Sequence, residues 1–175
     1  MKTPPHASSP RALIFLVGFM GAGKTTVGQA LADVMGWRFV DLDRVIEARE
    51  GQTVREIFET RGEPEFRRIE REAIAACGEM SETVISLGGG AYIAEANRAL
   101  MRELGLTVWL DCPLEVCLSR IGGDVDRPLL RGREEMGELF ERRRPAYAVA
   151  DLMIETGDRS PEELAAEILK LLPGH

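Results

Sequence analysis

The chain has 175 residues, of which 45% are hydrophobic and 29% charged, and its formal net charge is −7. This length and composition suit one domain with its own hydrophobic core. The acidic balance argues against a protein that binds nucleic acid or an anionic membrane surface. No apolar run approaches the roughly 18–20 residues of a membrane span. The cysteine count is odd and no C-x-x-C pair occurs, which disfavours a zinc site or a disulfide framework, so we expect a cytoplasmic protein.

The first residues differ in character from the rest of the chain. They contain Pro4, Pro5 and Pro10 and lack the apolar centre of a signal peptide. We therefore expect residues 1–11 to be a disordered N-terminal tail, followed by a single domain at residues 12–172.

Apolar stretches typical of strands alternate along this domain with amphipathic stretches typical of helices. We predict strands at 12–17, 37–41, 83–87, 106–110 and 152–154. We predict helices that end at Gly36 and lie at 44–50, 53–62, from 64, 94–104, from 113, 134–142 and about 161–172. This alternation predicts an α/β fold of three layers, in which helices cover both faces of a parallel sheet. Ligands of such folds bind beyond the carboxyl ends of the strands.

The most informative stretch is Gly18–Thr26, with the sequence GFMGAGKTT, between the first strand and the first helix. The spacing G-x-x-x-x-G-K-[ST] in this context is typical of a loop that binds the phosphates of a nucleoside triphosphate. Its glycines allow backbone N–H groups to approach the phosphate oxygens. Lys24 brings an ammonium group to the outer phosphates, and Thr25 offers a hydroxyl to Mg²⁺. The alternative, a glycine-rich turn without a ligand, fits this spacing poorly.

Two carboxylates, Asp41 and Asp43, come at the end of the second strand. If the extended geometry continues as far as Asp43, both side chains point the same way. One carboxylate could then hold Mg²⁺ beside the triphosphate while the other orients an acceptor hydroxyl and takes its proton. The alternative is that Asp43 only caps the next helix.

Two further motifs fall near the same end of the predicted sheet. Gly88–Gly90 leaves bare backbone after the third strand, which indicates either a close approach by another group or a flexible loop. On the helix after Pro64, Arg67 and Glu70 lie three residues apart, so Glu70 could hold the Arg67 guanidinium toward a substrate carboxylate. A solvated, salt-bridged helix face is the alternative for this pair.

Arginines cluster in two places in this acidic chain. The first cluster consists of Arg120, Arg127, Arg131 and Arg133, in and just before a segment without clear periodicity at 122–133. We interpret this segment either as a solvated loop or as one that closes and brings an arginine to a transferring phosphoryl group. The second cluster, Arg142–Arg144, indicates either a helix C-terminus or an anion site.

Together these motifs resemble those of the shikimate kinases, small P-loop kinases of aromatic amino-acid biosynthesis. The resemblance covers roughly residues 13–172 and rests on GFMGAGKTT (18–26), DLD (41–43), FRRIE (66–70), GGG (88–90), RPLL (127–130) and RRPAY (143–147). Many NTPases share the first motif, whereas the others in this order are specific to the family. The resemblance implies a P-loop kinase fold with a five-stranded parallel sheet. It also implies a shikimate-binding helical segment at about 43–76 and a mobile lid at about 121–133.

The resemblance further implies a role for individual residues. ATP would be bound by Gly21, Ala22, Gly23, Lys24, Thr25, Thr26, Arg120, Arg127 and Arg159. Shikimate would be bound by Asp43, Arg67, Gly88, Gly89, Gly90 and Arg143, with the two arginines on its carboxylate. Mg²⁺ would be held by Thr25 and Asp41. The catalytic residues would be Lys24, Asp43 and Arg127.

The expected activity is ATP-dependent phosphorylation of the 3-hydroxyl of shikimate, a step toward chorismate and the aromatic amino acids, by a monomer that uses Mg²⁺. A P-loop kinase for gluconate or a nucleoside monophosphate is the alternative enzyme, and a nucleotide-dependent regulator is the alternative of another class. The combined F-R-x-x-E and R-x-P-x-Y patterns favour shikimate. The absence of an N-K-x-D motif disfavours a GTP switch.

Overall fold

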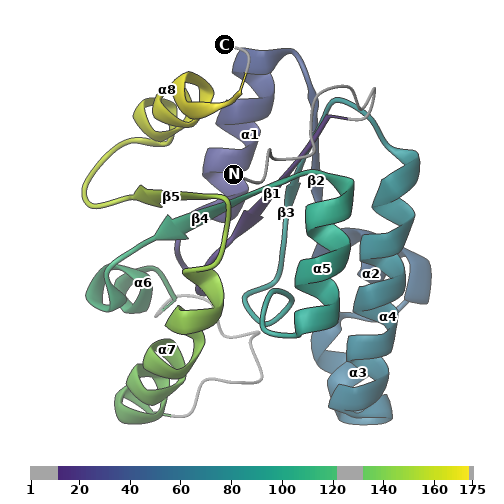
Figure 1. Ribbon diagram of the computed structural model, residues 1–175. Coiled ribbons are helices and arrows are strands. Elements are labelled where there is room, and N and C mark those ends of the chain that lie inside the picture. The colour runs from purple at the N-terminus through teal and green to yellow at the C-terminus, as the bar shows by residue number, and fades with distance from the viewer. Residues whose placement is uncertain (1–11, 122–131, 174–175) are drawn as a thin grey trace, which may run out of the picture.

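The computed structural model describes residues 12–121 and 132–173 (Figure 1). Within these residues, five parallel strands form one sheet in the order β2-β3-β1-β4-β5. The strands are β1 (Leu13–Val17), β2 (Arg38–Asp41), β3 (Thr83–Ser86), β4 (Leu106–Asp111) and β5 (Leu152–Glu155). The central strand β1 is buried over its whole length, as expected for a strand that helices cover on both faces.

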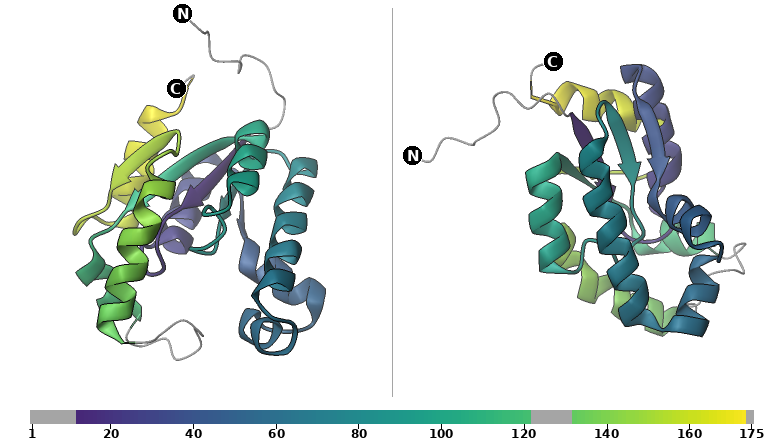
Figure 2. Two further views of the ribbon diagram at one scale, coloured as in Figure 1. Left: turned by 60° about the horizontal axis from the view of Figure 1, so that its bottom comes forward. Right: turned by 90° about the vertical axis from the view of Figure 1, so that its right-hand side faces the viewer.

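Helices cover both faces of this sheet, so the predicted three-layer α/β fold is confirmed. They are α1 (Lys24–Met35), α2 (Leu42–Glu50), α3 (Val54–Arg61), α4 (Glu63–Ala76), α5 (Glu95–Leu104), α6 (Leu114–Ile121), α7 (Arg133–Tyr147) and α8 (Pro161–Leu171), with a 3₁₀ turn at Cys77–Glu79. Helices α1 and α8 lie side by side on one face, and α5 covers the opposite face with α4 beside it (Figures 1 and 2). None of the described helices combines the length and apolar character that a membrane span requires.

Local signals in the sequence account for several helix ends. Thr53 and Ser160 each accept a hydrogen bond from the backbone of the third helical residue, whose glutamate side chain bonds back to the cap. These two capping boxes start α3 and α8 where the sequence predicts them. Gly36 and Gly51 end α1 and α2 in the left-handed conformation, which glycine adopts without steric cost.

The predicted start of α2 at Arg44 is wrong, and the error affects the expected geometry of the two carboxylates. Extended backbone ends at Asp41, and α2 begins at Leu42. The Asp41 carboxylate causes this early start because its Oδ1 atom accepts the backbone N–H groups of Asp43 (3.1 Å) and Arg44 (3.4 Å). The helix cap is therefore Asp41, and Asp43 lies in the first helical turn.

The predicted end of the helix at Arg142 is also wrong, because α7 continues to Tyr147. Met136, Phe140, Arg143 and Tyr147 recur every three or four residues and are all buried, so one continuous face holds the last turn against the protein. Pro145 lies inside this last turn, where it removes only one backbone hydrogen bond.

Two predictions concern residues outside the described ranges. The predicted tail at 1–11 is one of them. Residues 122–131 of the predicted lid are the other, and they include Arg127 and Arg131.

We expect Gly105→Ala to lower the free energy of unfolding by about 1–3 kcal/mol. A β-carbon at Gly105 would lie 2.3 Å from the carbonyl oxygen of Leu13, so the backbone of β1 would have to move. Chemical denaturation measures the effect. Gly137→Ala is the matched control, because a β-carbon there would meet its nearest neighbour at 3.7 Å and the helix α7 favours alanine. Equal stability of the two variants would contradict this account of Gly105.

Candidate functional site

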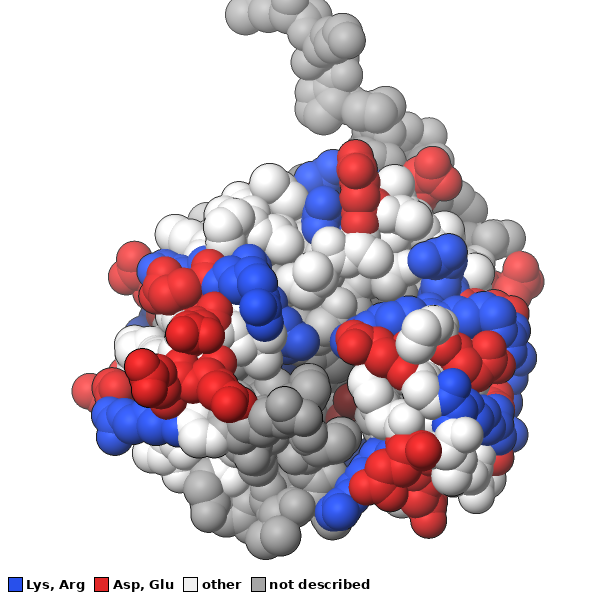
Figure 3. Space-filling model, turned by 90° about the horizontal axis from the view of Figure 1, so that it is seen from below, with Lys and Arg blue, Asp and Glu red and all other residues white. Residues whose placement is uncertain are grey.

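A cavity of about 900 Å³ opens beyond the carboxyl ends of β1, β2 and β3. Seen from below, the surface is hollowed between two charged flanks, and basic side chains lie on both sides of the hollow (Figure 3). The cavity is lined by many of the residues predicted for the site: Gly21, Gly23, Lys24, Thr25, Thr26, Asp41, Asp43, Arg67, Gly88, Gly89, Gly90, Arg120 and Arg143. The structure thus brings these predicted residues together in one place, at the end of the sheet where the fold predicts a ligand.

The loop between β1 and α1 has the shape of a phosphate cradle. Gly18, Gly21 and Gly23 have φ angles of 143°, 77° and 93°, which side chains rarely tolerate. Gly21 also packs closely on α6, since a β-carbon there would lie 2.7 Å from the carbonyl oxygen of Cys117. Because α1 begins directly after Gly23, the unpaired N–H groups and the positive dipole end of this helix face the loop.

Lys24 is buried at the start of α1, with 8% of its surface exposed. Its Nζ atom donates hydrogen bonds to the carbonyl oxygens of Gly18 (2.9 Å) and Phe19 (2.8 Å). The ammonium group is therefore held on the loop itself. A charge in this position lies beside the place that the loop offers to phosphate groups.

The oxygen atoms beside this cradle come from Thr25 and Asp41. The Thr25 hydroxyl donates to Oδ2 of Asp41 at 3.3 Å, while Oδ1 of the same carboxylate caps α2. One carboxylate oxygen and one hydroxyl next to a phosphate site suit a hard cation such as Mg²⁺, which prefers oxygen ligands. On this chemistry, Thr25 and Asp41 fit a magnesium ion.

Asp43 lies against the glycine run at the end of β3. A β-carbon at Gly88 would lie 3.0 Å from Oδ1 and 3.2 Å from Oδ2 of Asp43, so a side chain there would press on the carboxylate. The other two glycines of the run are also covered by charged groups. A β-carbon at Gly90 would lie 2.3 Å from Nη2 of Arg67, and one at Gly89 would lie 3.3 Å from Nη1 of Arg143. Close approach, rather than flexibility, therefore explains the bare backbone of this run.

A buried glutamate holds the guanidinium of Arg67. The Nη1 atom of Arg67 donates to both carboxylate oxygens of Glu70, at 3.0 and 2.8 Å, and Glu70 is only 1% exposed. The rings of Phe58 and Phe66 lie 5.9 and 5.2 Å from the guanidinium carbon. Burial raises the pKa of the Glu70 carboxyl, and the charge of Arg67 counteracts that rise. Arg67 is therefore oriented before any ligand arrives, as the sequence spacing suggested.

Arg143 approaches the same region from α7 and is largely buried. Burial lowers the pKa of its guanidinium, and the nearby positive charge of Arg67 lowers it as well. Two guanidiniums held near each other in a partly desolvated cavity repel each other. An anionic ligand between them would relieve that repulsion, and a carboxylate can accept two parallel hydrogen bonds from an arginine.

Arg120 connects α6 to the phosphate loop. Its Nη1 atom donates to the carbonyl oxygen of Gly21 at 3.1 Å, and the same atom would lie 3.3 Å from a β-carbon at Gly23. The arginine therefore lies on the loop at the edge of the cavity, a position from which it can reach a nucleotide held there.

This geometry matches a known family. The family model described as "Shikimate kinase" matches residues 20–173 of the chain. The chain belongs to the shikimate kinase family. A shikimate kinase of Geobacter sulfurreducens is 48% identical to it over 165 residues, which cover 93% of this chain and 91% of that protein. One of Persephonella marina is 46% identical over 157 residues, which cover 89% of this chain and 96% of that protein.

Solved structures of shikimate kinases share the fold. The shikimate kinase of Acinetobacter baumannii in complex with shikimate matches with a TM-score of 0.87 at 39% identity, over 92% of each chain. That of Aquifex aeolicus matches with a TM-score of 0.81 at 40% identity, over 90% of this chain and 94% of that one. The predicted P-loop kinase fold and the resemblance drawn from the motifs are both confirmed.

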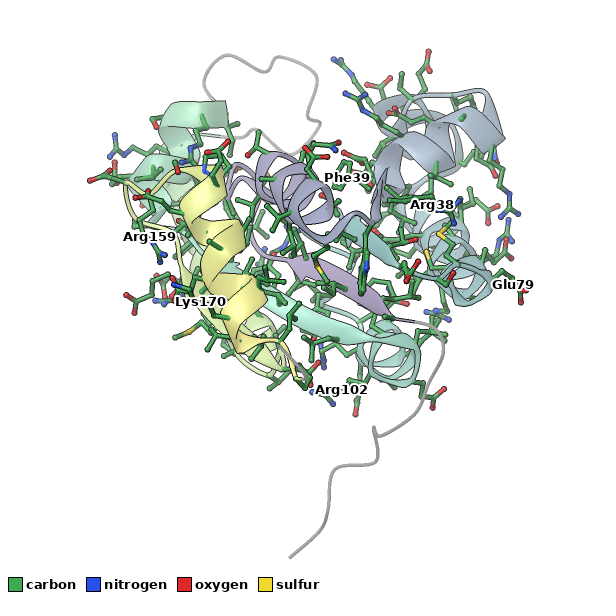
Figure 4. All side chains as sticks on the ribbon, turned by 90° about the horizontal axis from the view of Figure 1, so that it is seen from above. Arg38, Phe39, Glu79, Arg102, Arg159 and Lys170 are labelled. Carbon is green, nitrogen blue, oxygen red and sulfur yellow. The ribbon has the colours of Figure 1, made fainter. Side chains whose placement is uncertain are left out.

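Two residues that the resemblance assigned to ATP, Ala22 and Arg159, do not line the described cavity. Ala22 belongs to the loop and its side chain is buried. Arg159 contacts the carbonyl oxygens of Glu155 and Glu163 and forms an ion pair with Glu167, and it lies beside α8 in Figure 4. Arg127 lies outside the described residues.

One wall of the cavity consists of residues that were not predicted individually, although all of them fall within the helical segment at about 43–76 that the resemblance implies. This wall comes from α2, α3 and the turn between them, and consists of Arg44, Glu47, Thr53, Val54, Arg55 and Phe58. In the sequence these residues belong to two short helices with ordinary charge patterns. The packing of α3 beside α4 turns this face toward the site, so no local signal identified the individual residues.

Proposed function

We propose that this protein transfers the γ-phosphoryl group of ATP to the 3-hydroxyl of shikimate, giving shikimate 3-phosphate and ADP on the path to chorismate and the aromatic amino acids. The observation that carries this proposal is one cavity with a phosphate loop and two converging guanidiniums, Arg67 and Arg143. A triphosphate and a carboxylate-bearing acceptor are the ligands that such a cavity suits.

Substrate binding follows from this charge distribution. Arg67 and Arg143 would bind the shikimate carboxylate, with Glu70 keeping Arg67 in place. Backbone groups of Gly88–Gly90 would contact the ring of the substrate. Asp43 would accept a hydrogen bond from a shikimate hydroxyl, and its position against Gly88 supports this role.

ATP would be bound by Gly21–Thr26 and by the arginines of the site. The backbone N–H groups of the loop and the start of α1 would hold the phosphates. Arg120 would lie against the adenine ring. By family resemblance, Arg127 would reach the phosphates from the lid and Arg159 would contact the base.

Phosphoryl transfer passes through a loose transition state, so the protein mainly positions groups and stabilises charge. Asp43 would orient the 3-hydroxyl toward the γ-phosphorus and take its proton as the new bond forms. Lys24 and Arg127 would stabilise the negative charge on the transferred group. Thr25 and Asp41 would hold Mg²⁺, which when bound neutralises charge on the outer phosphates.

We also propose that the protein acts as a cytoplasmic monomer. The three cysteines Cys77, Cys112 and Cys117 are free and buried, which is compatible with a reducing compartment.

The test of this function is a coupled ADP-release assay with ATP and Mg²⁺ and, in separate reactions, shikimate, gluconate, AMP or no acceptor. We expect turnover with shikimate alone. Turnover with AMP instead would reject the carboxylate site while leaving the ATP site intact, and turnover with gluconate instead would reject shikimate as the acceptor. ATP binding without turnover on any acceptor would favour a regulator.

We expect Arg67→Ala to raise the KM for shikimate by about 10- to 100-fold, because a charge-assisted hydrogen bond to the carboxylate is lost. The KM for ATP should change little. Arg68→Ala is the matched control, since Arg68 is the next residue of α4 and its side chain is 55% exposed. Loss of ATP affinity at an unchanged shikimate KM would contradict the role of Arg67.

A further inference from the structure

The last residue of the R-x-P-x-Y motif, Tyr147, has a contact that the proposed mechanism does not use. Tyr147 ends α7 and is 1% exposed. Its hydroxyl donates a hydrogen bond to the carbonyl oxygen of Gly89, a residue 58 positions earlier in the chain. The end of α7 is thereby joined to the middle of the glycine run that lines the cavity.

The same hydroxyl interacts with the guanidinium of Arg143. Arg143 precedes Tyr147 by four residues, so both side chains lie on the buried face of α7. The side chain of Tyr147 lies near enough to Arg143 to counteract the lowering of its pKa by burial. Arg143 in turn lies over Gly89, where its Nη1 atom would be 3.3 Å from a β-carbon. Gly89, Arg143 and the Tyr147 hydroxyl therefore form one contact triangle.

The tyrosine itself is held firmly. Its ring packs near Trp109 of β4, with centroids 6.2 Å apart and planes tilted by 31°. Burial raises the pKa of Tyr147 to about 12, although the charge of Arg143 opposes this rise. The hydroxyl therefore stays protonated near neutral pH, so it donates to Gly89 while its oxygen remains available to the Arg143 guanidinium.

We propose that Tyr147 is a positioning residue for shikimate, whose hydroxyl holds the Gly89 backbone and the Arg143 guanidinium in the arrangement that receives the substrate carboxylate. Without the hydroxyl, the Arg143 side chain can rotate. Substrate binding must then order this side chain, which lowers the affinity for shikimate. This inference rests on the proposed function. It adds a residue that does not touch the substrate but sets the geometry of one that does.

The test compares Tyr147→Phe with Tyr92→Phe in the full chain. Tyr92 is a suitable control because it is also 1% exposed and its hydroxyl bonds to the Thr107 hydroxyl at 3.3 Å, outside the cavity. We expect Tyr147→Phe to raise the KM for shikimate about tenfold, with the KM for ATP and kcat within about twofold of wild type. Tyr92→Phe should leave all three within about twofold. A purely structural role for Tyr147 would lower the melting temperature without this selective change in KM, and that result would overturn the proposal.

A double-mutant cycle with Arg143→Lys then tests whether Tyr147 acts through Arg143. We expect the two effects on shikimate KM to be strongly non-additive, because the hydroxyl has little left to position once the guanidinium is gone. Additive effects would overturn the proposal. If Tyr147→Phe does not fold, Gly89→Ala is the alternative variant, because its β-carbon would press on the Arg143 guanidinium. An unchanged shikimate KM in Gly89→Ala would also overturn the proposal. Failure of the wild-type protein to phosphorylate shikimate would reject the proposed function itself, which separates the two outcomes.

Discussion

Replacement of Lys24 with alanine is expected to lower kcat by about two to three orders of magnitude. The ammonium group is held on the carbonyl oxygens of Gly18 and Phe19, beside the place where the loop would receive the phosphates. In the proposed mechanism its charge would stabilise the transferring group, and partial desolvation of the site would strengthen that effect. The coupled ADP-release assay at saturating ATP and shikimate measures the loss.

Lys170→Ala is the control for this experiment, because Lys170 is an exposed residue of α8 (Figure 4). It should retain the kcat of the wild type. The melting temperature of Lys24→Ala is needed as well, since the variant also loses two hydrogen bonds of the loop. A folded Lys24→Ala protein with near-wild-type kcat would reject the role of Lys24 in stabilising the transferred group.

Asp43→Asn is expected to lower kcat by about two to four orders of magnitude, with ATP binding retained. Asparagine keeps the size of the side chain beside Gly88 but cannot take the proton of the 3-hydroxyl. The effect should therefore appear in kcat, while ATP affinity, measured by titration, stays close to that of the wild type.

The control for Asp43→Asn is Asp33→Asn, the same chemical change at an exposed position of α1. It should not affect turnover. Near-wild-type kcat in Asp43→Asn would mean that Asp43 is not the base. Residue 43 would then only orient the hydroxyl, and the proton would pass to the phosphate.

Most of the fold was predictable because its signals are local. The apolar run of β1, the glycine loop and the capping boxes at Thr53 and Ser160 each depend on neighbouring residues. The two boundary errors have different causes, a local cap at the start of α2 and burial of the last turn of α7. Asp41 starts α2 two residues early with its own side chain, and the burial of Arg143 and Tyr147 carries α7 past the expected end.

The candidate site was predictable to a different degree at each position. Lys24 and Thr25 follow from a motif whose geometry is the same in many proteins, whereas Asp41 was proposed from its place at the end of the second strand. Arg67, Gly89 and Arg143 were assigned through family resemblance, because spacing alone also allowed a solvated helix face, a flexible loop and a helix terminus. The resemblance placed the cavity wall from α2 and α3 within the segment 43–76 but, of the residues of these two helices that line the cavity, named only Asp43. The residues that line the cavity and the contact of Tyr147 with Gly89 depend on long-range packing.

The two carboxylate oxygens of Asp41 make different contacts, which determines the best substitution at this position. Oδ1 supports the first turn of α2, whereas Oδ2 accepts from Thr25 at the proposed metal position. Alanine at this position would remove a contribution to folding and a contribution to cation affinity at once, so a loss of activity would have two indistinguishable origins. Asparagine caps helices about as well as aspartate but carries no charge. Asp41→Asn should therefore lower cation affinity while the free energy of unfolding stays close to that of the wild type, so the two contributions can be measured separately.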